Sequence, residues 1–199
     1  MIGIVDYHLN NLRSVQKAFE KVGVEAFISD KPNELQKAEK LVLPGVGAFG
    51  AAMKNLNALQ LISVLKEHTA ANKPLLGICL GMQLLFTKSF ELGEHNGLNF
   101  LEGTVEKFSA EVKVPHIGWN QLEIENHLPM LNGIKNFSFA YFVHSYYVVP
   151  KNEVILTQTT YGKRFASVVQ QGRIVGIQFH PEKSQEVGLQ LIKNFVECV

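Results

Sequence analysis

The chain has 199 residues, of which 46% are hydrophobic and 19% are charged, and its formal net charge is +1. These proportions are typical of an ordinary globular protein, and we expect residues 1–199 to form a single domain with a substantial core. The small net charge and the lack of long basic runs argue against nucleic acid or a membrane surface as a partner.

The chain begins with residues 1–6, which are typical of a strand and not of a signal peptide. No apolar run reaches membrane-spanning length. The two cysteines, Cys79 and Cys198, are too far apart to indicate a disulfide framework, so we expect a cytoplasmic protein. We also expect no metal and no cofactor, because metal-ligand spacing is absent among His8, His68, His95, His116, His127 and His144.

The first half of the chain alternates short apolar strands with helices. Strands are predicted at 2–5, 24–28, 40–43 and immediately before Cys79, and helices at 12–22, 49–56 and 59–71. This alternation indicates βα units and a parallel sheet.

The pattern changes beyond Gly97, where strands follow one another with few helices between them. They are predicted at 103–108, 137–143, 154–160, 165–170 and 174–179, and a last helix is predicted at 185–196. The sequence therefore predicts a three-layer α/β fold with a central, mostly parallel sheet and an antiparallel extension.

The segment 73–86 carries the strongest functional signal. Gly77 and Gly81 lie two residues before and after Cys79, where an apolar strand meets a helical pattern. This is the thiol form of the G-x-S-x-G nucleophile elbow, a tight turn that exposes the nucleophile. Glycines permit the close approach of strand and helix, and the helix N-terminus favours a thiolate. Cys198 lacks this frame and is interpreted as an ordinary cysteine.

A second segment supplies a candidate base. An apolar strand ends at His180, and Glu182 follows after one proline. A catalytic thiol needs a base, and the base needs a third group that fixes its tautomer. Taken alone, His180 is equally well explained as a packed strand-end residue, and Glu182 as a carboxylate in the first turn of the last helix. Together with Cys79 they complete a triad.

A third segment is a glycine-rich turn after the strand at 40–43. Gly45, Gly47 and Gly50 formally match the dinucleotide fingerprint G-x-G-x-x-G, although not on the first βα unit. Considered together with Cys79, the turn instead supplies the N–H of Val46 or Gly47, which would form an oxyanion hole with the N–H of Leu80. We expect the peptide at 45–46 to be able to reorient, because glycine permits both conformations.

These three segments, at 44–47, 77–83 and 180–184, resemble the motifs of the class I (triad) glutamine amidotransferases, in the same order along nearly the whole chain. The resemblance implies that Cys79, His180 and Glu182 hydrolyse the side-chain amide of L-glutamine. It also implies contacts with bound glutamine from four residues, for which the ordinary alternatives are exposed helix, solvated loop or strand-rim positions: Gln83, Glu91, Ser145 and Tyr146.

Two further segments, at 114–120 and 143–147, are similar to the members of the class that serve a (β/α)8-barrel cyclase in histidine biosynthesis. The resemblance implies a heterodimer with such a cyclase and contact residues at Asn11, Trp119, Asn120 and Lys183. A half-buried core position for Trp119 and a plain surface position for Lys183 are the alternatives. The first βα turn departs from the family, because His8 and Asn10 stand where glycine is usual.

Three other functions stay open from the sequence. The chain could be the glutaminase of a related synthase for surface sugars, or a stand-alone cysteine hydrolase. The third is a nucleotide-binding module built on residues 45–50.

Overall fold

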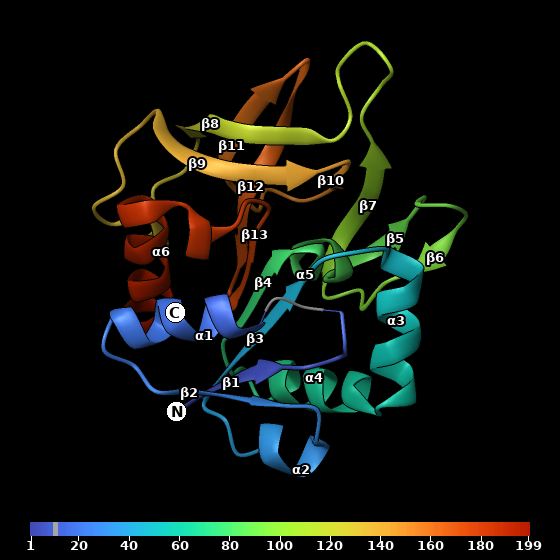
Figure 1. Cartoon of the computed structure of the whole chain (residues 1–199), viewed down its shortest axis with the longest axis vertical. Coiled ribbons are helices and arrows are strands. Elements are labelled where there is room, and N and C mark those ends of the chain that lie inside the picture. The colour runs from blue at the N-terminus through green and yellow to red at the C-terminus, as the bar shows by residue number, and fades with distance from the viewer. Residues whose placement is uncertain (10–11) are drawn as a thin grey trace.

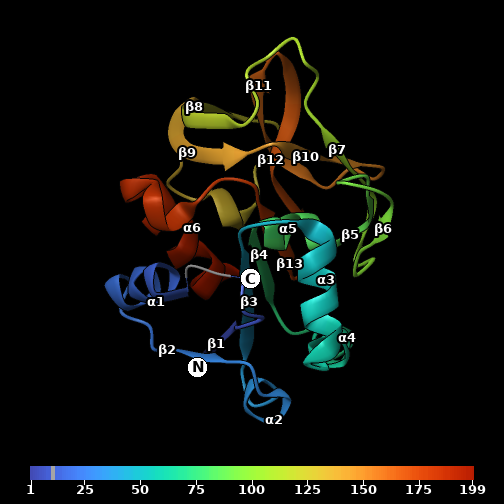
Figure 2. The same cartoon turned by 45° about the vertical axis from the view of Figure 1, so that its right-hand side comes forward.

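The fold is taken from a computed structural model that describes residues 1–9 and 12–199. Asn10 and Asn11, either of which is a suitable cap for the helix predicted at 12–22, lie outside the described residues. The chain folds around one large twisted sheet with helices on both faces (Figures 1 and 2). Among the described residues, no helix is long and apolar enough to cross a bilayer.

The large sheet has nine strands in the order β2-β1-β3-β4-β13-β12-β11-β8-β9. It is parallel from β2 to β13 and antiparallel from β13 to β9, as the sequence predicted. Its strands span Ile2–Val5 (β1), Ala26–Ser29 (β2), Lys40–Gly45 (β3), Leu75–Cys79 (β4), His116–Ile124 (β8), Ser138–His144 (β9), Ile155–Tyr161 (β11), Lys163–Gln171 (β12) and Ile174–Ile177 (β13).

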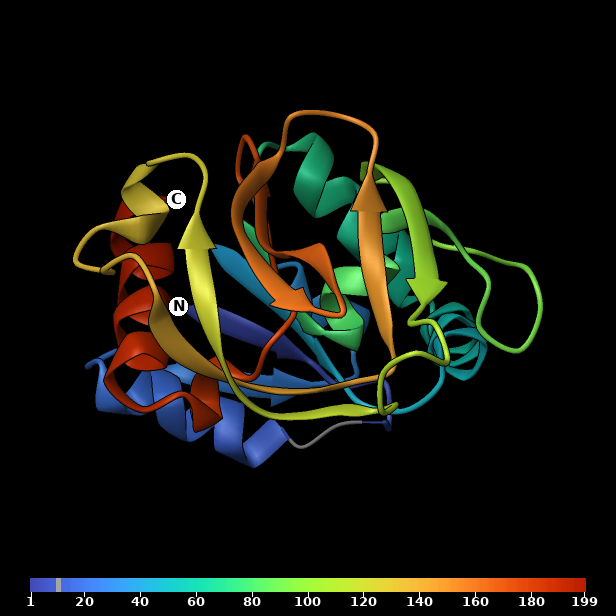
Figure 3. The same cartoon turned by 90° about the horizontal axis from the view of Figure 1, so that it is seen from above.

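Helices α1 (Leu12–Lys21) and α6 (Gln185–Cys198) cover one face of the parallel half, and α3 (Phe49–Ala58) and α4 (Leu61–Ala70) cover the other (Figure 3). Short helical segments complete the chain: α2 (Pro32–Leu35), α5 (Leu80–Leu84), η1 (Pro129–Leu131) and η2 (Pro181–Lys183). The three layers and the helices expected at 12–22, 49–56, 59–71 and 185–196 are confirmed.

Strand alternation explains why both faces are apolar. Side chains at successive positions of a strand point to opposite faces, so a strand buried on both sides is apolar throughout. In β3, Val42 packs into the core under α1 and α6, whereas Leu41 and Leu43 pack into the core under α3 and α4. Each fully buried leucine or valine contributes about 1.5–3 kcal/mol.

A second sheet of four strands, in the order β10-β7-β5-β6, was not predicted as a separate unit. Its strands span Phe86–Ser89 (β5), His95–Asn96 (β6), Leu101–Lys107 (β7) and Tyr146–Pro150 (β10). The helical pattern after Cys79, which in the sequence continues through Leu85 and Phe86, ends at Leu84, because Phe86 pairs with Leu101 of β7. Tertiary pairing therefore overrides the local spacing.

Strand β8 also escaped prediction, because its exposed positions carry large apolar side chains. Ile117 and Trp119 are 60% and 46% exposed, whereas His116 and Leu122 are buried. At the beginning of β8, therefore, the exposed side chains are apolar and the buried side chain of His116 is polar, which is the reverse of the usual pattern.

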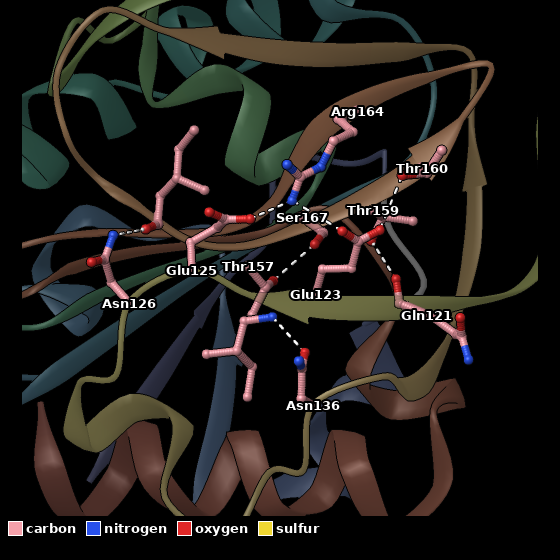
Figure 4. A network of polar contacts seen from close by, with 12 residues as sticks. Gln121, Glu123, Glu125, Asn126, Asn136, Thr157, Thr159, Thr160, Arg164 and Ser167 are labelled. Carbon is pink, nitrogen blue, oxygen red and sulfur yellow. Dashed lines mark hydrogen bonds and ion pairs between the residues drawn. The ribbon is translucent and has the colours of Figure 1, made fainter.

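Polar contacts join the antiparallel strands at their far end (Figure 4). Arg164 on β12 forms ion pairs with Glu123 at 3.0 Å and with Glu125. The hydroxyls of Thr157 and Ser167 form a buried hydrogen bond of 2.8 Å between β11 and β12. These contacts hold β8, β11 and β12 of the antiparallel extension together.

The turn from β4 into α5 depends on two glycines that have no room for a side chain. A Cβ at Gly81 would lie 1.7 Å from the carbonyl oxygen of Leu43 on β3, and a Cβ at Gly77 would lie 2.7 Å from the carbonyl oxygen of Gly81. The close approach expected from the glycine frame is therefore confirmed.

We predict that Gly81→Ala lowers the free energy of unfolding by at least about 3 kcal/mol, because the methyl group overlaps rigid backbone. Gly172→Ala is the matched control: its φ of +57° strains alanine, but no atom lies within 4 Å of the added Cβ. That strain costs about 1 kcal/mol. Urea unfolding of both variants measures the difference, and equal losses would contradict the steric explanation.

Candidate active site

Cys79 is the last residue of β4 and the cap of α5. Its φ is 54° and its ψ is −111°, a conformation that L-residues rarely adopt. Such backbone strain costs about 1–3 kcal/mol and occurs mainly at functional sites. The side chain is only 6% exposed, yet it lies on the wall of an open cavity. These features are those of a nucleophile elbow.

His180 and Glu182 lie beside Cys79 because β13 is parallel to β4. Ile177 pairs with Ile78, so the chain leaves both strands at the same edge of the sheet. His180 Nδ1 and Glu182 Oε1 are 2.8 Å apart, and the two side chains are 5% and 3% exposed. Because a carboxylate oxygen accepts, Nδ1 carries the proton in this bond, and Nε2 is left to meet the Cys79 side chain.

The charge state of His180 follows from these two partners. Burial alone lowers the pKa of the imidazole, but the hydrogen bonds and the charges of Cys79 and Glu182 outweigh it and raise the pKa of His180 to about 10. His180 is therefore an imidazolium at neutral pH, hydrogen-bonded to the Cys79 sulfur on one side and to the Glu182 carboxylate on the other. A proton is already in place for a leaving group.

A cavity of about 200 Å³ opens beside the Cys79 side chain. It brings together seven of the residues predicted from the sequence: Val46, Gly47, Leu80, Gln83, Glu91, Ser145 and Tyr146. Val143, His144 and Pro115 complete its wall. The size suits an amino acid or a similarly small molecule.

Gln83 and Gln178 form a buried pair of side-chain amides, of which only Gln83 was predicted from the sequence. Its Nε2 donates to the carbonyl oxygen of Tyr146 at 3.0 Å and to Gln178 Oε1 at 3.1 Å. The amide nitrogen of Gln178 in turn lies 3.9 Å from Cys79 Sγ. Gln178 was missed because a single polar residue in an apolar strand gives no recognisable motif.

Glu91 is anchored and is not a freely solvated loop charge. Its carboxylate accepts the N–H of Phe49 at 2.5 Å, at the N-terminus of α3, where the helix dipole favours negative charge. Partial burial and the charge of Glu91 raise the pKa of Tyr146. Both residues line the cavity.

The glycine-rich turn after β3 borders the cavity, but the Val46 N–H points away from it. This N–H donates to the carbonyl oxygen of Leu9 in the first βα turn at 3.2 Å. The oxyanion hole of Val46 or Gly47 with Leu80 therefore stays a prediction. Gly47 has a φ of +100°, and Gly50 leaves room for the ring of His95, so two of the three glycines are explained by turn geometry and packing.

Three of the residues predicted to contact a partner belong to the described part of the chain: Trp119 and Asn120 on β8, and Lys183 in η2. The rings of Trp119 and Tyr141 pack edge-on with 5.9 Å between their centroids. Lys183 Nζ lies 6.0 Å from the centroid of the Tyr141 ring. Asn120 turns inward and hydrogen-bonds to His116 and Thr160. Asn11 lies outside the described residues. Tyr141 links Trp119 to Lys183 and had no signal in the sequence.

No group of three or more histidine, cysteine, aspartate or glutamate side chains among residues 1–9 and 12–199 is placed to hold a metal ion.

Comparison with known proteins agrees with this geometry. The sequence pattern of the family described as "Glutamine amidotransferase class-I" matches residues 3–198. The chain belongs to this family, whose members are enzymes that hydrolyse glutamine. Family membership and the site geometry favour the glutaminase interpretation over the nucleotide-binding alternative on residues 45–50.

Within the family, the chain is similar to proteins named "Imidazole glycerol phosphate synthase subunit HisH". It is 54% identical over 194 residues to the one from Aquifex aeolicus, covering 96% of this chain and 94% of the relative. It is 51% identical over 199 residues to HisH 1 of Campylobacter jejuni (strain RM1221), covering 98% and 99%. The expected place of the chain among the histidine-pathway members is confirmed by this likeness.

Solved structures share the fold at much lower identity. A structure titled "Crystal structure of glutamine amidotransferase" has a TM-score of 0.79 and 21% identity, covering 98% of this chain and 97% of the other. PurLQS from Thermotoga maritima has a TM-score of 0.76 and 19% identity, covering 98% and 96%. The fold class predicted from the sequence is therefore confirmed.

The raised pKa of His180 predicts how stability depends on pH. The pKa is about 10 in the folded chain against 6.5 for a free imidazole. Below pH 6.5 both states hold the proton; at higher pH the unfolded chain loses it first, so the stabilising contribution declines as the pH rises toward 10. We expect the stability advantage of the unmodified protein over His180→Gln to be largest below pH 6.5 and to shrink toward pH 10.

The control for this prediction is His68→Gln, because burial lowers the pKa of His68. The contribution of His68 is lost as the pH falls below 6.5, and this variant should leave the slope above pH 6.5 unchanged. Urea unfolding at several pH values measures both variants. If the free energies of unfolding of the unmodified protein and of His180→Gln changed in parallel between pH 6.5 and 10, the raised pKa of His180 would be contradicted.

Proposed function

We propose that the chain is the glutaminase subunit of an imidazole glycerol phosphate synthase and passes ammonia to a (β/α)8-barrel cyclase subunit with which it forms a heterodimer. Residues 1–199 would act as one glutaminase domain. Identity of about half to HisH subunits over nearly the full length supports the pathway. The name of these relatives implies a complex, and the exposed apolar face on β8 and β9 supports a docking surface.

One observation carries the proposal for the site. A single cavity joins the strained Cys79 to four side chains, from separate parts of the chain, that we assign to glutamine binding: Gln83, Glu91, Ser145 and Tyr146. A structural cysteine needs neither the strained backbone nor such a cavity. The convergence supports a nucleophile with a bound amino acid beside it.

The reaction that this geometry supports proceeds in two steps. The Cys79 thiolate attacks the side-chain amide carbon of glutamine, and the oxygen becomes an oxyanion. His180 gives its Nε2 proton to the amide nitrogen, the C–N bond breaks, and ammonia leaves a γ-glutamyl thioester. Water then gives a proton to His180 and attacks the thioester, releasing glutamate and the thiolate. Glu182 holds the imidazole ring of His180 in orientation in both of its protonation states.

Stabilisation of the oxyanion would require a change at the turn after β3. The Val46 N–H is held by the Leu9 carbonyl oxygen, so reorientation of the peptide at 45–46 would free a donor for the cavity. One such donor contributes about 3–4 kcal/mol to transition-state stabilisation. We propose that the resting conformation is inefficient for this reason.

The face that would meet the cyclase includes Trp119 and Lys183, which both contact Tyr141. Tyr141 also connects to the triad, because its carbonyl oxygen accepts the N–H of His180 at 3.0 Å.

We predict that Cys79→Ser in the complex with the cyclase reduces glutamine-dependent synthesis at least about 10³-fold, because the covalent step loses its nucleophile. Synthesis from added ammonium salts should survive, since it bypasses the glutaminase site. Cys198→Ser is the control, because Cys198 is exposed and distant in sequence from the site, and should leave both rates unchanged. Loss of both activities in Cys79→Ser would contradict the proposal.

We predict that Trp119→Ala weakens binding to the cyclase at least about tenfold, because a partly exposed aromatic side chain is a typical interface anchor. Leu128→Ala is a matched control, because Leu128 is also a large exposed apolar residue, at 41%, but lies in the loop after β8. Isothermal titration calorimetry compares the two. Equal affinities for both variants would place the docking surface elsewhere.

A further inference from the structure

One wall of the cavity includes His144, which contacts a second buried histidine, His116, and the proposed reaction uses neither residue. His116 on β8 and His144 at the end of β9 face each other, with His116 Nδ1 3.0 Å from His144 Nε2. They are 3% and 5% exposed. His116 is stacked between the rings of Tyr161 and Phe142, at 4.0 and 5.0 Å between centroids.

The wall that these histidines support lies where the chain passes from the large sheet to the small one. Ser145 is the single residue between β9 of the large sheet and β10 of the small sheet, so no strand ladder holds it on both sides. His144 Nδ1 lies 2.8 Å from the carbonyl oxygen of Tyr146, the same oxygen that accepts the amide of Gln83. His144 therefore ties down the segment that borders the nucleophile.

The hydrogen bonds determine the tautomer of each ring. A carbonyl oxygen can only accept, so His144 Nδ1 carries a hydrogen and donates to Tyr146. Burial, the largest effect, lowers the pKa of His144 to about 3 and that of His116 to about 4, so both rings are neutral at pH 7. His144 Nε2 must then accept, and His116 Nδ1 must donate to it.

The chain of donors ends at Asn120. The Gln121 N–H donates to Asn120 Oδ1 at 2.8 Å, which turns the Asn120 amide nitrogen toward His116 Nε2, 3.3 Å away. The hydrogen bonds thus run in one direction: Asn120 donates to His116, His116 donates to His144, and His144 donates to the carbonyl oxygen of Tyr146. Asn120 adjoins Trp119, which lies on the proposed docking face.

We propose that His116 and His144 are positioning residues: held as neutral Nδ1–H tautomers, they fix the Ser145–Tyr146 wall for glutamine binding and connect it to Asn120 beside the docking face. The inference rests on the proposed function, because it assigns a role to that same site. Neither ring has to touch the reacting atoms for this role.

Substitutions at His144 test the role, because asparagine and glutamine imitate different nitrogens of the ring. Asparagine can place its amide nitrogen near Nδ1 and keep the donor to Tyr146, whereas the amide of glutamine reaches toward Nε2 and abandons it. In the complex with the cyclase, we expect His144→Gln to raise KM for glutamine about tenfold, the usual effect of losing one hydrogen bond. His144→Asn should stay within about threefold.

Controls separate positioning from a general loss of structure. Ammonium-dependent synthesis should be the same in both variants and in the unmodified complex. Equal KM values for His144→Asn and His144→Gln would overturn the positioning role while leaving the glutaminase intact. If the unmodified complex itself fails to hydrolyse glutamine, the proposed function fails instead, so the two failures are distinguishable.

A spectroscopic measurement detects the tautomers in the unmodified protein, and variants serve only to assign the signals. Long-range ¹H–¹⁵N correlation spectra at pH 7 distinguish the two neutral tautomers of each imidazole. We expect His116 and His144 both to carry hydrogen on Nδ1, with assignments made from His116→Phe and His144→Phe. An Nε2–H tautomer or an imidazolium at either position would overturn the proposed chain of donors.

Discussion

The contact of Gly81 with the carbonyl oxygen of Leu43 is the constraint on which the site depends. With no side chain at this position, α5 can lie against β3, and the turn at Cys79 is forced into its strained conformation. Because β3, β4 and β13 are parallel, their C-terminal ends lie at the same edge of the sheet. Cys79, the turn after β3 and His180 are neighbours for this reason, although they are far apart in the sequence.

Electrostatics then gives the same residue type two different roles. His180 is buried, but Cys79 and Glu182 compensate the cost of its charge, so its pKa rises and it can donate a proton. His116 and His144 are also buried, but they face each other and aromatic rings. Desolvation dominates there and lowers both pKa values. One imidazole is suited to proton transfer, and the other two are suited to holding a fixed hydrogen-bond direction.

Motifs with a strict backbone requirement were predictable from the sequence. The glycines around Cys79 and the spacing of His180 and Glu182 predicted both the elbow and the triad, and the alternation of strands and helices predicted the layers. Contacts made by tertiary pairing were not predictable. Strand β8 places Ile117 and Trp119 outward, the helix after Cys79 gives way to β5 at Phe86, and Gln178 and Tyr141 act through partners remote in sequence. The engagement of the Val46 N–H by Leu9 also depends on folding and leaves no local pattern.

The central claim is that the cavity beside Cys79 binds glutamine and presents its side-chain amide to the sulfur. Mass spectrometry after treatment of the complex with an electrophilic glutamine analogue tests this most directly. The account predicts one covalent adduct, located on Cys79 and suppressed by excess glutamine, even though Cys198 is the more exposed thiol. Labelling of Cys198 in preference to Cys79, or labelling of Cys79 that glutamine does not suppress, would contradict it.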